Sequence, residues 1–213
     1  MFFSNIQNLI LKTYKKPMDE SLLTNVNDSN TTKETEASLS YEEYKPSKAK
    51  DLRSHIITAV GLNLLDIIKE NSQYKNYITK DKFYLSHLPS ISLNDYIKRL
   101  VKYTNMDIST LINAIIYMDT FCEKQNYILC MNNVYLVLLS VCLLSYKFNE
   151  DVPINLKNYA QIAGISLENL ISLEFALHSN LLFDLFVKED LYKTYYDYFS
   201  NYEIPIVKKD KEV

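Results

Sequence analysis

The chain has only two glycines, Gly61 and Gly164, among its 213 residues. Loops that cradle phosphate groups need several glycines at fixed spacing, because only a residue without a side chain lets the backbone approach a phosphate so closely. Two glycines that lie far apart in the sequence cannot form such a loop. The sequence therefore contains no phosphate-binding loop of this kind.

Cysteine and histidine are also scarce, with three residues of each. Cys122, Cys130 and Cys142 lack the spacing of a metal site, and two of them fall within helical patterns. We interpret them as reduced core thiols of an intracellular protein, in the cytoplasm, the nucleus or both. The histidines are scattered and suggest no catalytic constellation. We therefore expect no metal site, no cofactor, no small-molecule ligand and no enzymatic activity.

The charges are nearly balanced, since 23 Lys and Arg residues against 26 Asp and Glu residues give a net charge of −3. A protein that binds nucleic acid usually carries a basic face that neutralises phosphates. The slightly acidic balance therefore argues against nucleic acid as the main partner. With 47% hydrophobic residues, a chain of this length can form one good core with a tail left over.

The N-terminal part of the chain divides into two segments of different composition. Residues 1–16 predict a short amphipathic helix, whose apolar side consists of Phe3, Ile6, Leu9 and Ile10. The three lysines that follow this stripe also permit a helix on a membrane surface, but we favour a strap folded against the protein and expect no membrane association. Residues 17–50 are polar and have too few apolar side chains to offset the entropy cost of ordering, which predicts a flexible linker.

The stretch from Met131 to Tyr146 carries no formal charge, and its large apolar side chains point in every direction around a helix. Such a helix must be surrounded by protein or by lipid. A bilayer requires about 20 apolar residues, whereas this stretch is shorter and is interrupted by Asn132, Asn133, Ser140 and Ser145. We therefore predict the buried central helix of an all-α domain.

Apolar residues that recur every three or four positions predict six further helices. These cover residues 52–69, 93–103, 109–124, 156–163, 167–181 and 188–198. Gly164 is a suitable residue to end the fourth of them, and Ser166 is a suitable N-cap for the fifth. Together with the central stretch, the helices between about residues 92 and 182 predict a five-helix core.

Charges that interrupt apolar faces are candidates for function, because a buried charge is costly unless it is paired. We predict that Arg99 and Asp119 form a structural charge pair between two helices of the core. Lys147 either binds a partner or satisfies the last carbonyl groups of the central helix. Glu174 either binds a partner or pairs with His178 four residues later. No nucleophile or catalytic base accompanies these charges, which argues against catalysis.

Several motifs, taken in order and spacing, resemble the cyclin box. They begin at Pro89 and read PSISLNDYIKRLVKY, YMD, YKFNED, NLKNYAQIAGI and SLEFALHSNLLFDL, ending at Leu185. The resemblance is closest to the P/U-type cyclins, the phosphate-regulon cyclins of yeast. It implies a cyclin-like domain over residues 51–200, with a single box at about 89–185 and a tail at 201–213. The box would be a five-helix bundle around the central helix, with extra N- and C-terminal helices outside it.

The resemblance implies a regulatory subunit that binds and activates a cyclin-dependent protein kinase, in cell-cycle or nutrient control. The cyclin surface would hold the C-helix of the kinase in its inward position, where the glutamate of that helix pairs with the lysine that binds ATP. Two alternatives remain open. One is a helical adaptor that does not activate a kinase, and the other is a module that uses this fold on DNA as transcription factor IIB does.

The resemblance also assigns candidate kinase-binding residues. Lys147 and Glu174 match the paired charges that grip the C-helix, and His178 stands where a leucine is usual. The apolar contacts around this grip would come from Leu144, Phe148, Phe183 and Leu185. Glu150 and Asp151 follow Lys147 closely, so we expect both to project beside the kinase face. There Asp151 would help to order the activation loop of the kinase by hydrogen-bonding its arginines.

Overall fold

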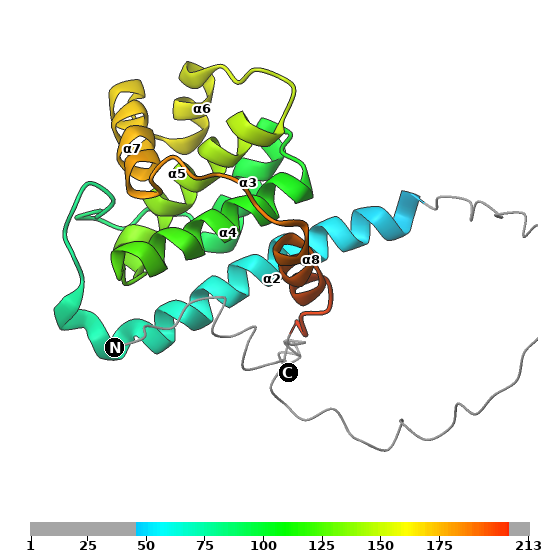
Figure 1. The fold of residues 1–213 in the computed structure, drawn as a ribbon, viewed down its shortest axis with the longest axis horizontal. Helices are drawn as coiled ribbons and strands as arrows, with labels where there is room; N and C mark the ends of the chain where they lie inside the picture. The colour runs from blue at the N-terminus through cyan, green and yellow to red at the C-terminus, as the bar shows by residue number, and fades with distance from the viewer. Residues whose placement is uncertain (1–45, 205–213) are drawn as a thin grey trace, which may run out of the picture.

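The structure is a computed structural model that describes residues 46–204 (Figure 1). Within this range the chain forms seven α-helices, one 3-10 helix and no strand. The elements are α2 (Pro46–Asn71), η2 (Ser72–Tyr77), α3 (Leu93–Thr104), α4 (Ile108–Gln125), α5 (Met131–Asn149), α6 (Leu156–Ala163), α7 (Leu167–Asn180) and α8 (Glu189–Ser200). The predicted all-α class is confirmed. Three predicted parts lie outside the described residues: the strap helix, residues 17–45 of the linker and residues 205–213 of the tail.

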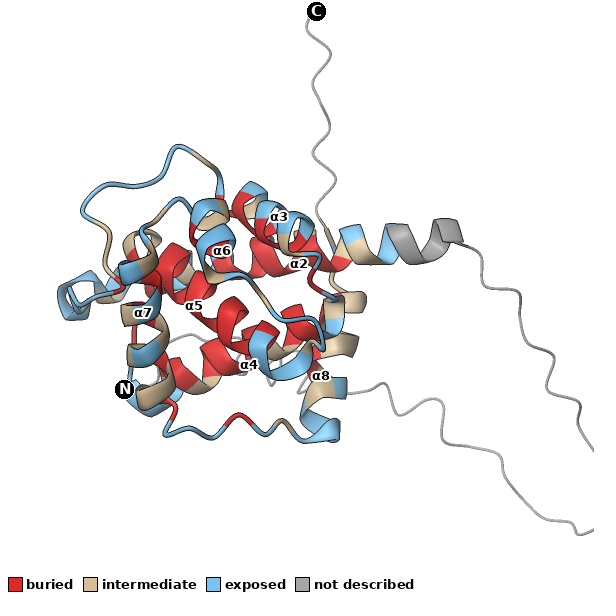
Figure 2. Cartoon of the chain, turned by 90° about the horizontal axis from the view of Figure 1, so that it is seen from above, coloured by how far each residue is buried: buried red, intermediate tan, exposed pale blue. Residues whose placement is uncertain are grey.

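Helix α5 is the centre of the fold (Figure 2), and every residue from Asn133 to Tyr146 is buried. It packs against α3, α4 and α7. Tyr159 of α6 reaches it as well, because its hydroxyl donates a hydrogen bond to the Leu139 carbonyl at 3.3 Å. By length and composition α5 alone among the described helices could cross a membrane, but 78% of that stretch is buried inside the fold. The prediction of a buried central helix is therefore confirmed.

Polar side chains and one glycine fix where the helices around α5 begin and end. Ser92, Asn155 and Ser166 accept hydrogen bonds from backbone N–H groups in the first turns of α3, α6 and α7. These bonds satisfy donors that have no partner within the helix. Helix α6 ends at Gly164, whose φ of 77° lies in the left-handed region that glycine adopts without strain. The roles predicted for Ser166 and Gly164 are confirmed.

Helix α2 begins at Pro46, inside the residues that were assigned to the linker. Proline is well suited to the first turn of a helix, where its missing N–H group costs nothing, and the following lysines and alanine are good helix formers. Figure 1 shows α2 as a long helix that runs past the bundle, with α8 lying across it. Helix α2 contacts α3 and α8, so it packs as part of the helical domain.

The structure contradicts the predicted charge pair between Arg99 and Asp119, because the two side chains face different neighbours. Arg99 lies on the exposed face of α3, and its Nε donates a hydrogen bond to the Ile162 carbonyl of α6 at 2.8 Å. Asp119 lies on the buried face of α4 and accepts a hydrogen bond from the Tyr195 hydroxyl of α8. Burial and the neighbouring Asp119 carboxylate raise the pKa of Tyr195 well above its usual value. Tyr195 therefore keeps its proton and ties α8 to α4.

Replacing Tyr195 by phenylalanine should lower the free energy of unfolding by about 1–3 kcal/mol, because a buried carboxylate loses a donor. Urea denaturation followed by circular dichroism measures the change. The matched control is Tyr196→Phe, on the same helix, whose half-buried ring stacks on Tyr192. This control should change the free energy of unfolding by no more than about 0.5 kcal/mol. Equal effects of the two substitutions would show that the Tyr195 hydroxyl does not stabilise the fold.

Candidate partner-binding site

Lys147 at the end of α5 and Glu174 in the middle of α7 form an ion pair at the surface. The distance from Lys147 Nζ to Glu174 Oε1 is 2.6 Å, and the side chains are 36% and 18% exposed. The predicted proximity of these two charges is confirmed. The alternative pair of Glu174 with His178 is not formed among the described residues, and the ring of His178 packs against Phe183 in a tilted arrangement instead, with 4.4 Å between ring centroids.

Two of the predicted apolar contact residues are exposed beside this ion pair. Phe148, which follows Lys147, is 58% exposed, and Phe183 is 63% exposed. Leu182 and Phe183 also have φ angles of 57° and 59°. This left-handed conformation is strained for bulky side chains, at a cost of about 1–3 kcal/mol each, and such strain clusters at functional sites. The turn after α7 thus holds two large apolar side chains in solvent at a cost in stability.

The other two predicted contacts, Leu144 and Leu185, are buried rather than presented at the surface. Leu144 lies on α5 one turn before Lys147, within the core. The carbonyl of Leu185 accepts a hydrogen bond from the Tyr117 hydroxyl of α4 at 2.8 Å. Both leucines therefore support the exposed residues from beneath, and a direct contact with a partner does not fit the structure.

The structure adds apolar residues that the sequence reasoning missed. Ile171 and Phe175 lie on the same side of α7 as Glu174 and His178, because residues three, four and seven positions apart share one face. The exposed apolar residues of this region are Phe148, Val152, Ile171, Phe175, Leu182, Phe183 and Phe186. We call these seven residues the apolar face. Large exposed apolar patches mark sites of protein–protein interaction.

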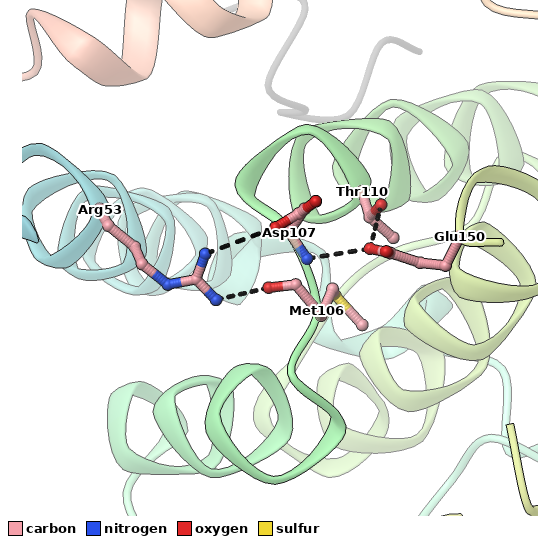
Figure 3. Close-up of polar contacts among 5 residues, drawn as sticks. All are labelled: Arg53, Met106, Asp107, Thr110 and Glu150. Carbon is pink, nitrogen blue, oxygen red and sulfur yellow. Dashed lines mark hydrogen bonds and ion pairs between the residues drawn. The ribbon is translucent and has the colours of Figure 1, made fainter. Parts of the chain in front are cut away.

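Glu150 has a different role from the predicted one. Its Oε1 accepts hydrogen bonds from the Asp107 backbone N–H at 2.9 Å and from the Thr110 hydroxyl at 2.7 Å (Figure 3). Asp107 precedes the first residue of α4 and its own side chain makes no capping bond. Glu150 therefore caps α4 from the end of α5 and does not project toward a partner. Asp151, the next residue, is exposed.

Arg53 of α2 joins the same corner (Figure 3). Its Nη2 donates a hydrogen bond to the Met106 carbonyl at 2.5 Å, and its Nη1 lies 4.0 Å from Asp107 Oδ1. Helix α2, the start of α4 and the end of α5 are thus connected through Arg53 and Glu150. This connection fixes the backbone from which Lys147 and Phe148 project.

Metal-binding clusters and reactive thiols are two signs of catalytic chemistry. Among residues 46–204, no cluster of three or more His, Cys, Asp or Glu side chains could hold a metal ion. Burial raises the pKa of Cys142 to about 12 and raises that of Cys122 well above its usual value. A thiol with a raised pKa is a poor nucleophile, because the thiolate is the reactive form. The two buried thiols are therefore core residues.

An ion pair with exposed aromatic side chains around it is typical of surfaces that bind another protein. The comparisons with known proteins agree with this class. The family model described as Cyclin matches residues 16–185. Cyclin-U4-3 of Arabidopsis thaliana is 29% identical over 146 residues, which cover 68% of this chain and 67% of the relative. Cyclin-U4-2 of the same plant is 29% identical and covers 74% of each chain, and rice Cyclin-P4-1 is 30% identical over about half of each chain.

The chain therefore belongs to the cyclin family, and its relatives are consistent with the P/U type. Cyclins are regulatory proteins, which gives this chain a regulatory role. The resemblance inferred from the motifs between Pro89 and Leu185 is confirmed. The family match also begins far before Pro89, at residue 16, so it includes the sequence of α2.

Removing the cap that Glu150 provides should destabilise the fold. Glu150→Ala should lower the free energy of unfolding by about 0.5–2 kcal/mol, the usual cost of losing a helix cap. Asp151→Ala is the matched control, because this neighbouring carboxylate is exposed, and it should cost no more than about 0.5 kcal/mol. Urea denaturation of both variants measures the difference. If Glu150→Ala were as stable as Asp151→Ala, the bonds to Asp107 and Thr110 would contribute nothing.

Proposed function

We propose that this chain binds and activates a cyclin-dependent protein kinase. The observation that carries the proposal is the Lys147–Glu174 ion pair with exposed aromatic residues around it. The family supports a kinase as the partner, since cyclins regulate kinases. The proposal includes an intracellular location, in the cytoplasm, the nucleus or both, where such kinases act.

The proposed mechanism is a shift in the conformational population of the kinase. A kinase is active only when the glutamate of its C-helix pairs with the lysine that binds ATP. The apolar face would bury the apolar side of that helix, and the Lys147–Glu174 pair would bind its polar groups. Because these contacts form only with the inward position of the helix, binding favours the active state.

The apolar face also explains how binding could be specific. Phe175 is 68% exposed and Phe186 is 77% exposed, and each aromatic side chain can bury a large area at an interface. They extend the contact beyond the ion pair, along α7 and the segment that follows it. A kinase that matches this surface must present apolar side chains on both sides of its charged contact. The proposal therefore includes Phe175 and Phe186 among the kinase-binding residues.

The substitution Lys147→Glu should abolish capture of the kinase when tagged protein is purified from its native cell. The chain should stay folded, and the free energy of unfolding should fall by about 1 kcal/mol, since ion pairs that solvent still reaches contribute little. The matched control is Lys98→Glu, which reverses a charge in an exposed pair with Asp95 on α3. This control should capture the kinase normally.

The double substitution Lys147→Glu with Glu174→Lys separates binding from folding. It should restore the ion pair and the stability, yet it should not restore kinase capture, because the two charges are exchanged with respect to the partner. Capture of the kinase by the double variant would mean that the pair acts only within the fold. Capture of proteins without any kinase among them would favour an adaptor.

We further propose that Asp151 helps to order the activation loop of the kinase. The exposed carboxylate lies three residues after Phe148, and it can accept bidentate hydrogen bonds from arginines that otherwise bind a phosphate. Asp151→Asn should therefore activate unphosphorylated kinase markedly less than the unmodified chain, in a peptide-phosphorylation assay at saturating concentration. Kinase that is already phosphorylated on its loop is the control and should respond equally to both chains. Equal activation of the unphosphorylated kinase would reject this role.

A further inference from the structure

The structure contains a second surface feature, a groove on the side of α2 and α8. Its volume is about 510 Å³, and it lies between the C-terminal half of α2, the start of η2 and the end of α8. Its lining includes Asn63, Asp66, Glu70, Tyr198 and Tyr202. None of these residues belongs to the apolar face, so the groove is separate from the proposed kinase site.

The groove has an aromatic wall and a polar floor. Tyr198 and Tyr202 pack edge to face, with 5.9 Å between ring centroids. Asn63 Nδ2 donates a hydrogen bond to the Tyr198 hydroxyl at 2.8 Å, and the Tyr202 hydroxyl donates to Asp66 Oδ2 at 2.9 Å. Helix α2 contributes the carboxylates of Asp66 and Glu70 to the floor, together with Lys69, so acidic groups outnumber basic ones there. A segment that fits this groove has apolar side chains for the wall and cationic side chains for the floor.

Asn63, which contributes to the lining of the groove, has a buried polar atom without a hydrogen-bond partner. The side chain of Asn63 is 1% exposed, and its Oδ1 has no hydrogen-bond partner among the described residues. Exchanging the oxygen and nitrogen of the amide would leave the nitrogen without a partner instead, so one atom lacks a partner in either orientation. A buried polar atom without a partner costs about 1–3 kcal/mol. This cost would be removed only if the Asn63 side chain turned toward a polar group of a segment bound in the groove.

The chain itself contains a segment with the required chemistry, in residues 1–16. Phe3, Ile6, Leu9 and Ile10 form the apolar stripe found in the sequence. Lys12, Lys15 and Lys16 follow it, and their charge is complementary to the carboxylates of Asp66 and Glu70. The nine residues after Ile204 also contain lysines, but they lack an apolar stripe of this kind.

The length of the chain between the two elements also fits. Residues 17–45 separate this segment from the start of α2 at Pro46. The groove begins at Asn63, about 26 Å further along α2 at 1.5 Å per residue. A random-coil chain of 29 residues has a root-mean-square end-to-end distance of about 30 Å. A tether gives the highest effective concentration when this length matches the span.

We propose that residues 1–16 dock as an amphipathic helix in the groove between α2 and α8, with the apolar stripe on Tyr198 and Tyr202 and the lysines toward Asp66 and Glu70. The docked segment would clamp α8 against α2. This inference does not depend on kinase binding.

The absence of tryptophan from the chain allows a direct test, because a single introduced tryptophan reports on one position. Phe3→Trp places the probe on the apolar stripe, and Asn8→Trp places it on the opposite side of the same helical period. In the full-length chain, Phe3→Trp should emit at shorter wavelength than Asn8→Trp and should be quenched less by iodide. Equal emission and quenching of the two variants would overturn the proposal.

A second substitution locates the docking site. Asp66→Lys, added to Phe3→Trp, should shift the emission to longer wavelength, because it reverses a charge in the groove. Asp51→Lys is the matched control, since it reverses an exposed charge near the other end of α2, and it should leave the emission unchanged. If Asp66→Lys had no effect, the stripe would be buried elsewhere and the proposal would be wrong. If the emission of Phe3→Trp shifted to shorter wavelength only when anionic lipid vesicles were added, the stripe would bind a membrane. If the emission depended on protein concentration, the stripe would bind a second copy of the chain. Either result would overturn the proposal.

Discussion

The burial of α5 is the constraint on which the rest of the structure depends. A helix with apolar side chains in every direction is stable only when other helices surround it, and each fully buried Leu or Val contributes about 1.5–3 kcal/mol. Helices α3, α4, α6 and α7 provide this cover. Because the covering helices leave only the end of α5 at the surface, Lys147 and Phe148 emerge at a defined place beside Glu174 of α7. The packing of the core thus positions the candidate site.

The sequence predicted the parts of the fold that depend on apolar period and helix capping. Helices α3, α4, α6, α7 and α8 lie within one or two residues of their predicted bounds, since the pattern of buried side chains directly reflects which face packs inward. Helix α5 continues three residues beyond the uncharged stretch that predicted it. The proximity of Lys147 and Glu174 was predicted as well, from the resemblance to cyclins. The role of this pair in binding a kinase remains a proposal, because proximity alone is also compatible with a structural ion pair.

The errors concern polar contacts between distant parts of the chain. Glu150 caps α4 across 43 positions of sequence, and Asp119 bonds to Tyr195 across 76 positions. The spacing of apolar residues within one helix shows which face of the helix a residue lies on. It does not show which residue of another helix that residue contacts. Ile171 and Phe175 were missed for a different reason. The inner face of α7 is already filled by Leu170, Leu173 and Leu177. A helical wheel would therefore have placed Ile171 and Phe175 on the outer face, where apolar side chains are unusual.

The apolar face has a consequence for the solubility of the chain on its own. Seven large apolar side chains in water favour any association that covers them, including contact between identical chains. A partner that binds only the folded chain also stabilises it by mass action. The free chain is therefore the species most prone to aggregation and to removal by cellular quality control. If the proposed kinase covers this face, the amount of the chain that persists in the cell is limited by the supply of that kinase.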